Sequence, residues 1–234
     1  MTKKDQSEKR VCSVSHRGCV SMVPIFNHLD TLQMEEIMET VQAHSFKRGE
    51  LIYRAGDTSD VLTIVNKGSL RIYRLSESGK EQLVRVLKPG EFTGELALFN
   101  ETVHENYAEA MEATSVCQIT RASLQKLLIK YPSISLKILQ ALSSRLDESE
   151  QQAAQFSTES TEQRLASYLA DLLVEDDQSA IVTLPLTKKD LASYIGTTPE
   201  TVSRKLKELE EMQLIRRISS SKIEILDEEK LLFL

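Results

Sequence analysis

The chain has 234 residues, of which 41% are apolar and 27% charged, a composition that excludes disordered, collagen-like and membrane proteins. Its length allows two modest hydrophobic cores. The net charge of −6 excludes a generally basic surface, so any nucleic-acid site must be local, and the lack of an apolar signal segment or membrane span leads us to expect a cytoplasmic protein.

The first predicted element is an amphipathic helix between Asp30 and Val41. Met34, Ile37, Met38 and Val41 follow one another at the spacing of a single helix face. This spacing predicts a helix that packs one side against a core.

A region of short strands follows, from about residue 49 to residue 119. Runs of β-branched and aliphatic residues alternate there with turns, and six of the eight glycines lie in those turns. Regular short strands separated by glycine are typical of an antiparallel sandwich or barrel, and we expect a β-roll. The predicted strands are Leu51–Tyr53, Val61–Val65, Leu70–Leu75, Leu83–Leu87 and Val116–Ile119.

A long helix is predicted after Tyr131 and Pro132, because no glycine or proline interrupts the sequence there. Apolar residues recur in steps of three and four, the spacing of a coiled-coil seam, and this favours a parallel homodimer over a helix packed on its own domain. The polar stretch 157–161 is expected to be a hinge before a second helix. The predicted dimer-interface residues are Leu139, Leu142, Leu146, Ala153 and Phe156.

The segment from Thr187 onward predicts a helix-turn-helix. Thr187 and Asp190 have the arrangement of a helix N-terminus, in which the threonine oxygen accepts a backbone N–H and the acidic side chain reciprocates. Gly196 suits a tight turn that needs a positive φ, and Pro199 suits the first position of a second helix, after a threonine cap.

One face of the second helix is predicted to read DNA. Val202, Leu206 and Leu209 should face the core, which leaves the polar side chains on the opposite face. Arginine can pair with guanine, glutamate can accept from cytosine and serine can do either, whereas a lysine is better suited to phosphate. The predicted DNA-binding residues are Lys188, Thr198, Glu200, Ser203, Arg204 and Lys207.

A wing is predicted after the second helix. The segments 214–218 and 223–226, each with aliphatic residues at both ends, flank the polar tip Ser219-Ser220-Ser221-Lys222, as in a hairpin. From Thr187 to Lys222, eight basic residues stand against five acidic ones, so this segment carries +3 on an acidic chain. The asymmetry favours a patch that faces phosphate.

Taken in order, these elements resemble the Crp/Fnr family of bacterial regulators from about Cys12 to Lys222. The segment Pro199-Glu200-Thr201-Val202-Ser203-Arg204 is similar to the Fnr-type reading helix. The resemblance implies a homodimeric transcription regulator that binds palindromic double-stranded DNA with TTGAT-like half-sites, has RNA polymerase as a further partner, and is not an enzyme.

The β-roll also carries a partial resemblance to a nucleotide site. The segment from Gly94 to Phe99 is similar to the start of the family's cyclic-nucleotide phosphate cassette, but no Lys or Arg stands between Lys88 and Arg121 to neutralise a phosphate. We therefore exclude cyclic AMP as effector and expect Glu95 to be a surface carboxylate. A regulator that binds another small molecule in the β-roll remains the alternative function.

Three cysteines form an odd set that argues against a disulfide framework and allows a metal or redox role. Cys12, His16 and Cys19 lie close together, and the segment around Cys117 resembles the Fnr segment that supplies the central cluster ligand. The resemblance implies a metal site, an iron–sulfur cluster of the 4Fe–4S type on these four residues, although Fnr proteins bring a third N-terminal cysteine where this chain has His16.

Three alternatives use the same residues. One is a reversible disulfide between Cys117 and Cys12 or Cys19, which is how the lactic-acid-bacterial Fnr-like proteins are understood to work. Another is a zinc site with three thiolates and one imidazole. In the third, the cysteines are inert, with Cys117 a small buried apolar residue.

The sequence therefore predicts an α+β fold made of a cyclic-nucleotide-binding-like β-roll, a long dimerisation helix and a C-terminal winged helix-turn-helix. The expected parts are an N-terminal cysteine and histidine segment at 1–25, a β-roll sensor at 26–130, the dimerisation helix at 131–157 and the DNA-binding domain at 158–234. We expect this regulator to respond to oxygen or redox state.

Overall fold

The computed structural model describes residues 23–77, 79–95, 102–174 and 180–234. The chain divides into two compact units. The first ends at Arg145, and the second consists of Leu146–Leu234 with Glu81–Leu83. Among the described residues, no helix is both long enough and apolar enough to span a membrane.

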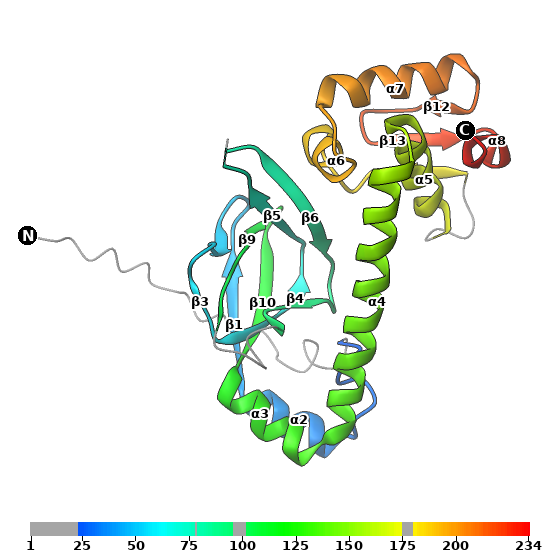
Figure 1. Ribbon diagram of the computed structural model, residues 1–234. Coiled ribbons are helices and arrows are strands. Elements are labelled where there is room, and N and C mark those ends of the chain that lie inside the picture. Colours follow the sequence, from blue (N-terminus) through cyan, green and yellow to red (C-terminus); the bar gives the residue numbers. More distant parts are fainter. Residues whose placement is uncertain (1–22, 78, 96–101, 175–179) are drawn as a thin grey trace, which may run out of the picture. The chain divides into compact units, whose positions relative to one another are not determined.

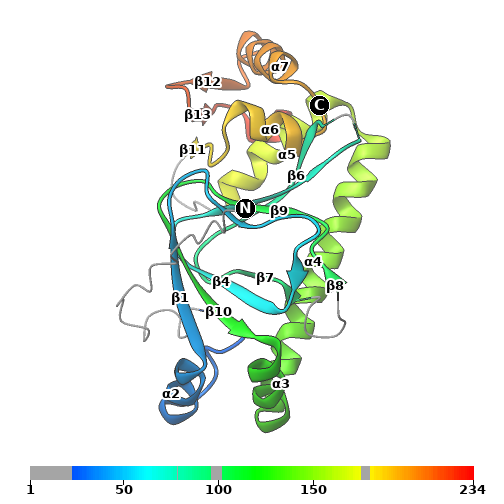
Figure 2. The ribbon, with the colours of Figure 1, turned by 90° about the vertical axis from the view of Figure 1, so that its left-hand side faces the viewer.

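The first unit is built around a β-roll of two four-stranded sheets (Figure 1). One sheet has the order β1-β10-β4-β7 and the other β2-β9-β5-β6, and β3 pairs with β8 in a short ribbon. Strands β1 and β10 run side by side in antiparallel pairing (Figure 2). The strands are β1 Val41–Phe46, β2 Leu51–Tyr53, β3 Thr58–Ser59, β4 Val61–Lys67, β5 Leu70–Leu75, β6 Glu81–Leu87, β7 Phe92–Thr93, β8 Thr102–Val103, β9 Tyr107–Ala110 and β10 Thr114–Thr120.

Helices α2 (Thr31–Glu39), α3 (Arg121–Lys130) and the start of α4 (Pro132–Thr158) cover one sheet. Asp30 caps α2 through a capping box, in which its carboxylate accepts from the Gln33 N–H at 2.9 Å. The helix predicted to reach Val41 ends earlier. That part of the prediction is wrong because Val41 opens β1, where it pairs with Ile119 of β10 and is buried.

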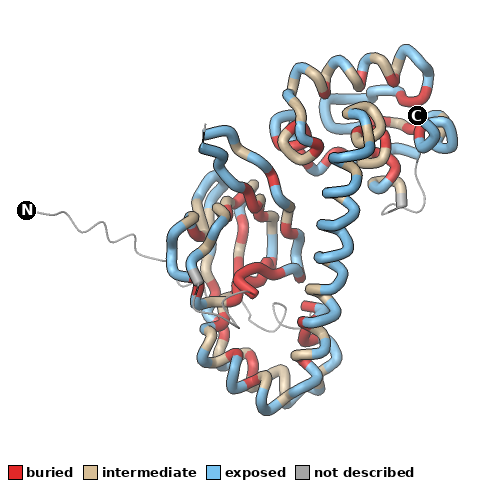
Figure 3. The backbone as a smooth tube through the Cα atoms, in the orientation of Figure 1, coloured by how far each residue is buried: buried red, intermediate tan, exposed pale blue. Residues whose placement is uncertain are grey.

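Two hydrophobic clusters stabilise this unit. One lies between the β1-β10-β4-β7 sheet and the helices, and the other lies between the two sheets. Strand β4 contributes to both, with Ile64 in the first cluster and Val65 in the second. Five consecutive residues of β4, from Leu62 to Asn66, are buried because both of its faces are covered. Buried residues, red in Figure 3, recur along these strands.

The second unit is a winged helix-turn-helix. Its three-stranded sheet has the order β11-β13-β12, and its core is formed by the apolar faces of α5, α6 and α7. The elements after α4 are α5 Thr161–Val174, β11 Ile181–Thr183, α6 Lys188–Tyr194, α7 Pro199–Glu211, β12 Ile215–Arg217, β13 Lys222–Ile225 and α8 Glu228–Leu232. The predicted α+β fold, with its β-roll, long helix and winged helix-turn-helix, is confirmed.

Candidate nucleic-acid interface and redox site

The helix-turn-helix begins at a capped N-terminus. The Thr187 hydroxyl oxygen accepts the Asp190 N–H at 3.2 Å, and the same hydroxyl donates to the Asp190 carboxylate at 2.7 Å. Asp190 is buried, so this short bond satisfies a charge that would otherwise be costly inside the unit. The cap therefore fixes where α6 starts.

The turn between α6 and α7 requires glycine for two reasons. Gly196 has φ of +74°, and a Cβ at this position would lie 2.6 Å from the ring of Phe156. A side chain would therefore be strained and would also collide with the aromatic ring. After the turn, Thr198 caps α7 by accepting the Thr201 N–H at 3.3 Å, and Pro199 takes the first helical position.

Helix α7 has one buried face and one polar face. Val202, Leu206 and Leu209 are at most 1% exposed, as the spacing predicted. Glu200, Ser203, Arg204 and Lys207 lie on the other side at helical spacing, where all but the half-buried Ser203 are exposed. Two further predicted residues, Thr198 at the cap of α7 and Lys188 at the start of α6, are also exposed.

The cations of the polar face form only weak ion pairs with acidic residues of the same helix. Arg204 Nε lies 3.7 Å from Glu208, and Lys207 Nζ lies 3.4 Å from Glu211. Exposed pairs of this kind contribute little because water screens them and side-chain entropy opposes them. Both cations can therefore exchange these partners for DNA.

Helix α4 exposes large apolar side chains. Leu139 is 58% and Leu146 is 59% exposed, and Leu136, which the seam prediction did not include, is 69% exposed. Ala153 is exposed as well, whereas Leu142 packs partly against the first core cluster. Phe156 packs against Gly196 and lies under the guanidinium of Arg164, at 5.1 Å from the ring centroid.

Cys117 lies in the middle of β10, between Ala43 of β1 and Ile64 of β4, and is 2% exposed. Its sulfur is in a disulfide. Cys12, His16 and Cys19 lie outside the described residues. A disulfide sulfur offers no thiolate to a metal, so Cys117 in this state does not fit a ligand of an iron–sulfur cluster or of zinc. In the described ranges, no three His, Cys, Asp or Glu side chains form a group that could hold a metal ion.

Comparison with known proteins agrees with this architecture. Residues 43–131 match the cyclic nucleotide-binding domain, and residues 163–234 match the Crp-like helix-turn-helix domain. The chain is 37% identical to the probable transcriptional regulator flp of Lacticaseibacillus casei, over 91% of this chain and 95% of that protein. The chain belongs to the Crp/Fnr family of transcriptional regulators.

Two further Crp/Fnr proteins are similar over most of their length. The anaerobic regulatory protein of Pasteurella multocida is 27% identical, over 87% of this chain and 74% of that protein. The structure of FixK2 from Bradyrhizobium japonicum is 25% identical with a TM-score of 0.72, covering 82% of this chain and 95% of that one. The family consists of transcription regulators rather than enzymes.

The β-roll of this Crp/Fnr protein contains a buried charge cluster that the sequence did not predict. Glu95 is 9% exposed, and its Oε1 lies 3.3 Å from Arg85 and 3.2 Å from Arg145 of α4. The expectation of a surface carboxylate is wrong because the carboxylate is buried and paired with these two arginines. Arg145 also stacks over Phe92, at 4.3 Å from the ring centroid, and donates to the Phe92 carbonyl at 2.7 Å.

This cluster is strongly desolvated and incompletely bonded. Burial lowers the pKa of Arg145 below its ordinary value, and the nearby Arg85 charge lowers it further. Glu95 Oε2 and Arg85 Nε are buried without a hydrogen-bond partner in the part of the chain that the structure describes. Such atoms need a water or a ligand group to satisfy them.

Proposed function

We propose that the protein is a cytoplasmic, redox-responsive transcription regulator that binds palindromic DNA with TTGAT-like half-sites as a homodimer. The observation that carries the redox part is the disulfide at Cys117. The reading part is supported by the exposed face of α7, where Glu200 and Arg204 stand clear of the core. In this proposal residues 1–25 carry the sensor cysteines, 26–130 the β-roll, 131–157 the dimer helix and 158–234 the DNA-binding domain.

The proposed switch is a two-electron oxidation of two thiols. Cys117 and either Cys12 or Cys19 would form one S–S bond, while an oxidant derived from oxygen takes two electrons and two protons. This bond would tie the N-terminal segment to β10. Cys117 belongs to the same core cluster as Ile134 and Ile138 of α4, which gives the switch a packed connection to the dimer helix.

The proposed dimer uses the exposed apolar residues of α4. A second copy that packs against Leu139 and Leu146 would remove apolar surface from water and set the separation of the two α7 helices. Half-sites about one helical turn apart require such a fixed separation. RNA polymerase is the partner that we propose for the DNA-bound dimer.

An iron–sulfur cluster on Cys12, His16, Cys19 and Cys117 is the rival form of the redox proposal. It requires Cys117 to be reduced, and the names of the relatives, such as the anaerobic regulatory protein, favour a response to oxygen in either form. A protein purified without oxygen would then absorb visible light and contain iron and sulfide. A colourless protein without iron favours the disulfide.

A second candidate function is favoured by the charge cluster of the β-roll. Glu95 Oε2 and Arg85 Nε, which have no hydrogen-bond partner among the described residues, suit a small ligand that has both an anionic group and a hydrogen-bond donor. This function would be supported over the redox switch by two results. Denaturing the native protein would release a small molecule, and the DNA affinity would not change on thiol oxidation.

The test measures DNA affinity by fluorescence anisotropy with reduced and oxidised protein, on a TTGAT palindrome and on a scrambled duplex. For the wild type we expect the affinity for the palindrome to differ between redox states by about 5- to 150-fold, the usual range of coupling between sites. Cys117→Ser should bind equally in both states.

Cys12→Ser and Cys19→Ser serve as the matched variants, since only the one that removes the partner of Cys117 should lose the response. Equal affinity of oxidised and reduced wild type would refute the redox switch. Equal affinity for the palindrome and the scrambled duplex would refute the proposed recognition sequence.

A further inference from the structure

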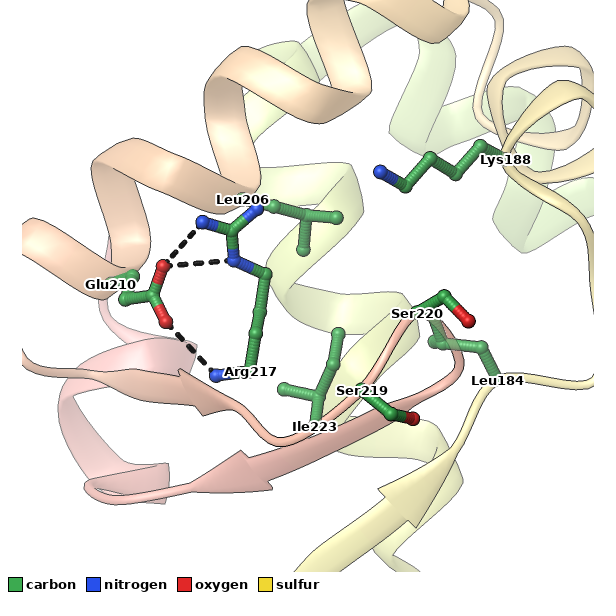
Figure 4. Close-up of a pocket in the computed structure, with 8 residues that line it drawn as sticks. All are labelled: Leu184, Lys188, Leu206, Glu210, Arg217, Ser219, Ser220 and Ile223. Carbon is green, nitrogen blue, oxygen red and sulfur yellow. Dashed lines mark hydrogen bonds and ion pairs between the residues drawn. The ribbon is translucent and has the colours of Figure 1, made fainter.

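A cavity of about 380 Å³ lies between the reading helix α7 and the wing (Figure 4). One wall is apolar and is formed by Leu184, Leu206 and Ile223. The polar lining comes from three elements: Lys188 from α6, Glu210 from α7, and Arg217 with two serines from the wing. The cavity therefore joins a predicted DNA-binding lysine to the wing, beside the face that reads DNA.

Arg217 of the wing is held by Glu210. The Arg217 backbone N–H donates to Glu210 at 3.0 Å, and its side chain donates at 2.8 Å from Nε and 2.5 Å from Nη2. These contacts hold the pKa of Glu210 below its ordinary value. Both side chains are about one third exposed, at 37% and 33%, so solvent and ions reach the pair.

Lys188 differs from Arg217, which is held by a carboxylate. It is exposed and forms no ion pair with any residue that the structure describes, and it reaches into the space across from the Glu210–Arg217 pair. Two cations and one carboxylate leave the lining with a net positive charge, and Ser219 and Ser220 add hydroxyl groups. A lysine, an arginine and small hydroxyl side chains are the groups that proteins use to hold a DNA backbone phosphate.

We propose that this cavity binds one backbone phosphate of DNA through Lys188 and Arg217, and that Glu210 competes with that phosphate for Arg217. The inference rests on the proposed DNA-binding function. A phosphate offers the guanidinium the same paired acceptor oxygens as a carboxylate, so the two anions exclude each other at Arg217. Glu210 therefore lowers the affinity for any duplex, independently of its sequence.

The experiment measures the affinity of the full-length protein for a duplex without the palindrome over a series of salt concentrations. Each phosphate contact contributes about 0.9 to the slope of log affinity against log salt, so Arg217→Gln and Lys188→Gln should each reduce the slope by about that amount. Glu210→Gln should tighten binding by up to about fivefold, because an exposed pair is weak. In an Arg217→Gln background the same change should give no gain.

Glu211→Gln is the matched control, because it removes the same charge from α7 but frees Lys207. Its effect should be the same with and without Arg217. An equal gain from Glu210→Gln in both backgrounds, or unchanged slopes in both Arg217→Gln and Lys188→Gln, would overturn the proposal. Lys188→Gln keeps the test decisive if a Glu210 variant fails to fold, since Lys188 has no ion-pair partner among the described residues to lose.

Two other outcomes would test the DNA-binding function itself and the identity of the anion. No binding of any duplex by the wild type would refute the DNA-binding function itself. If inorganic phosphate binds to the wild type but not to Arg217→Gln while the DNA slopes stay unchanged, the cavity is a site for a free anion and the assignment to DNA is wrong.

Discussion

Arg204 shows at the scale of one residue why the exposed face of α7 is proposed to read DNA. Its side chain is 67% exposed, and its acidic neighbour Glu208 is 3.7 Å away, too far for a strong hydrogen bond. The guanidinium is therefore available for two parallel bonds to a guanine. Lys207 on the same face has a point charge that suits phosphate but cannot specify a base.

We predict that Arg204→Ala weakens binding to the palindrome by about 1–3 kcal/mol and relaxes selectivity at one base pair. Lys207→Ala is the control, since the loss of a phosphate contact should weaken all duplexes alike. The measurement compares affinities for half-sites changed at each base in turn. If Arg204→Ala keeps the wild-type preference at every position, Arg204 does not read a base.

Single residues also show where sequence reasoning stops. The sequence predicted a positive φ at Gly196. The contact of Gly196 with Phe156 joins residues 40 positions apart, so no local sequence pattern predicts it. Glu95 was expected at the surface because its partners, too, are distant in the sequence. Its partners Arg85 and Arg145 come from β6 and α4, and only the folded chain brings them together.

At the scale of elements, periodicity predicted the long helix α4 but not which of its faces is exposed. The predicted seam included Leu142 and Phe156, and both have partners within the chain. The most exposed large apolar side chains of α4 are Leu136, Leu139 and Leu146, whereas Phe156 is 38% exposed. Leucines at helical spacing predict an apolar stripe, but packing against the domain's own core decides which of them remain for a partner.

We predict that Leu146→Glu converts the proposed dimer to a monomer, because a carboxylate buried in an apolar interface without a partner is costly. Specific DNA binding should fall with it, since two half-sites must be held together. Ser144→Glu, at an exposed position on another face of α4, should leave the dimer intact. Sedimentation gives the oligomeric state, and a Leu146→Glu protein that stays dimeric would rule out this face as the interface.

The strands show the same limit. Runs such as Leu70–Leu75 were predicted because they are apolar and bounded by turns. Strand β9 was not predicted because two of its four residues, Tyr107 and Glu109, carry polar groups and interrupt the apolar run. In the folded chain Glu109 forms an ion pair with Arg71 at 2.9 Å. Helix α3 was missed although Thr120 caps it, because its apolar stripe is short.

At the scale of the whole molecule, the chain forms two compact units with separate cores. Leu124 lies in the core of the first and Leu169 in that of the second, and both are fully buried. The length of the chain predicted two cores, because 234 residues exceed the usual size of one small domain. The boundary of the two units lies inside the continuous helix α4, which a search for linkers cannot find.

We predict two transitions in the thermal unfolding of the full-length protein, since units with separate cores need not unfold together. Leu124→Ala should destabilise only one transition and Leu169→Ala only the other, each by about 2–5 kcal/mol. Leu32→Ala and Leu232→Ala, at positions 78% and 55% exposed, should shift neither by a comparable amount. Calorimetry measures this, and one shared transition shifted by both core variants would show that the units unfold as one.

The burial of Cys117 affects how fast its disulfide can be reduced rather than how tightly the protein binds DNA. A sulfur in a residue that is 2% exposed, in a strand paired on both sides, meets a soluble reductant only when β10 opens locally. In the proposed switch, reduction by attack at the Cys117 sulfur is then limited by that opening and not by the reductant concentration. A cell that leaves an oxidising environment would keep oxidised regulator for a while, so the protein would record recent exposure as well as the present state.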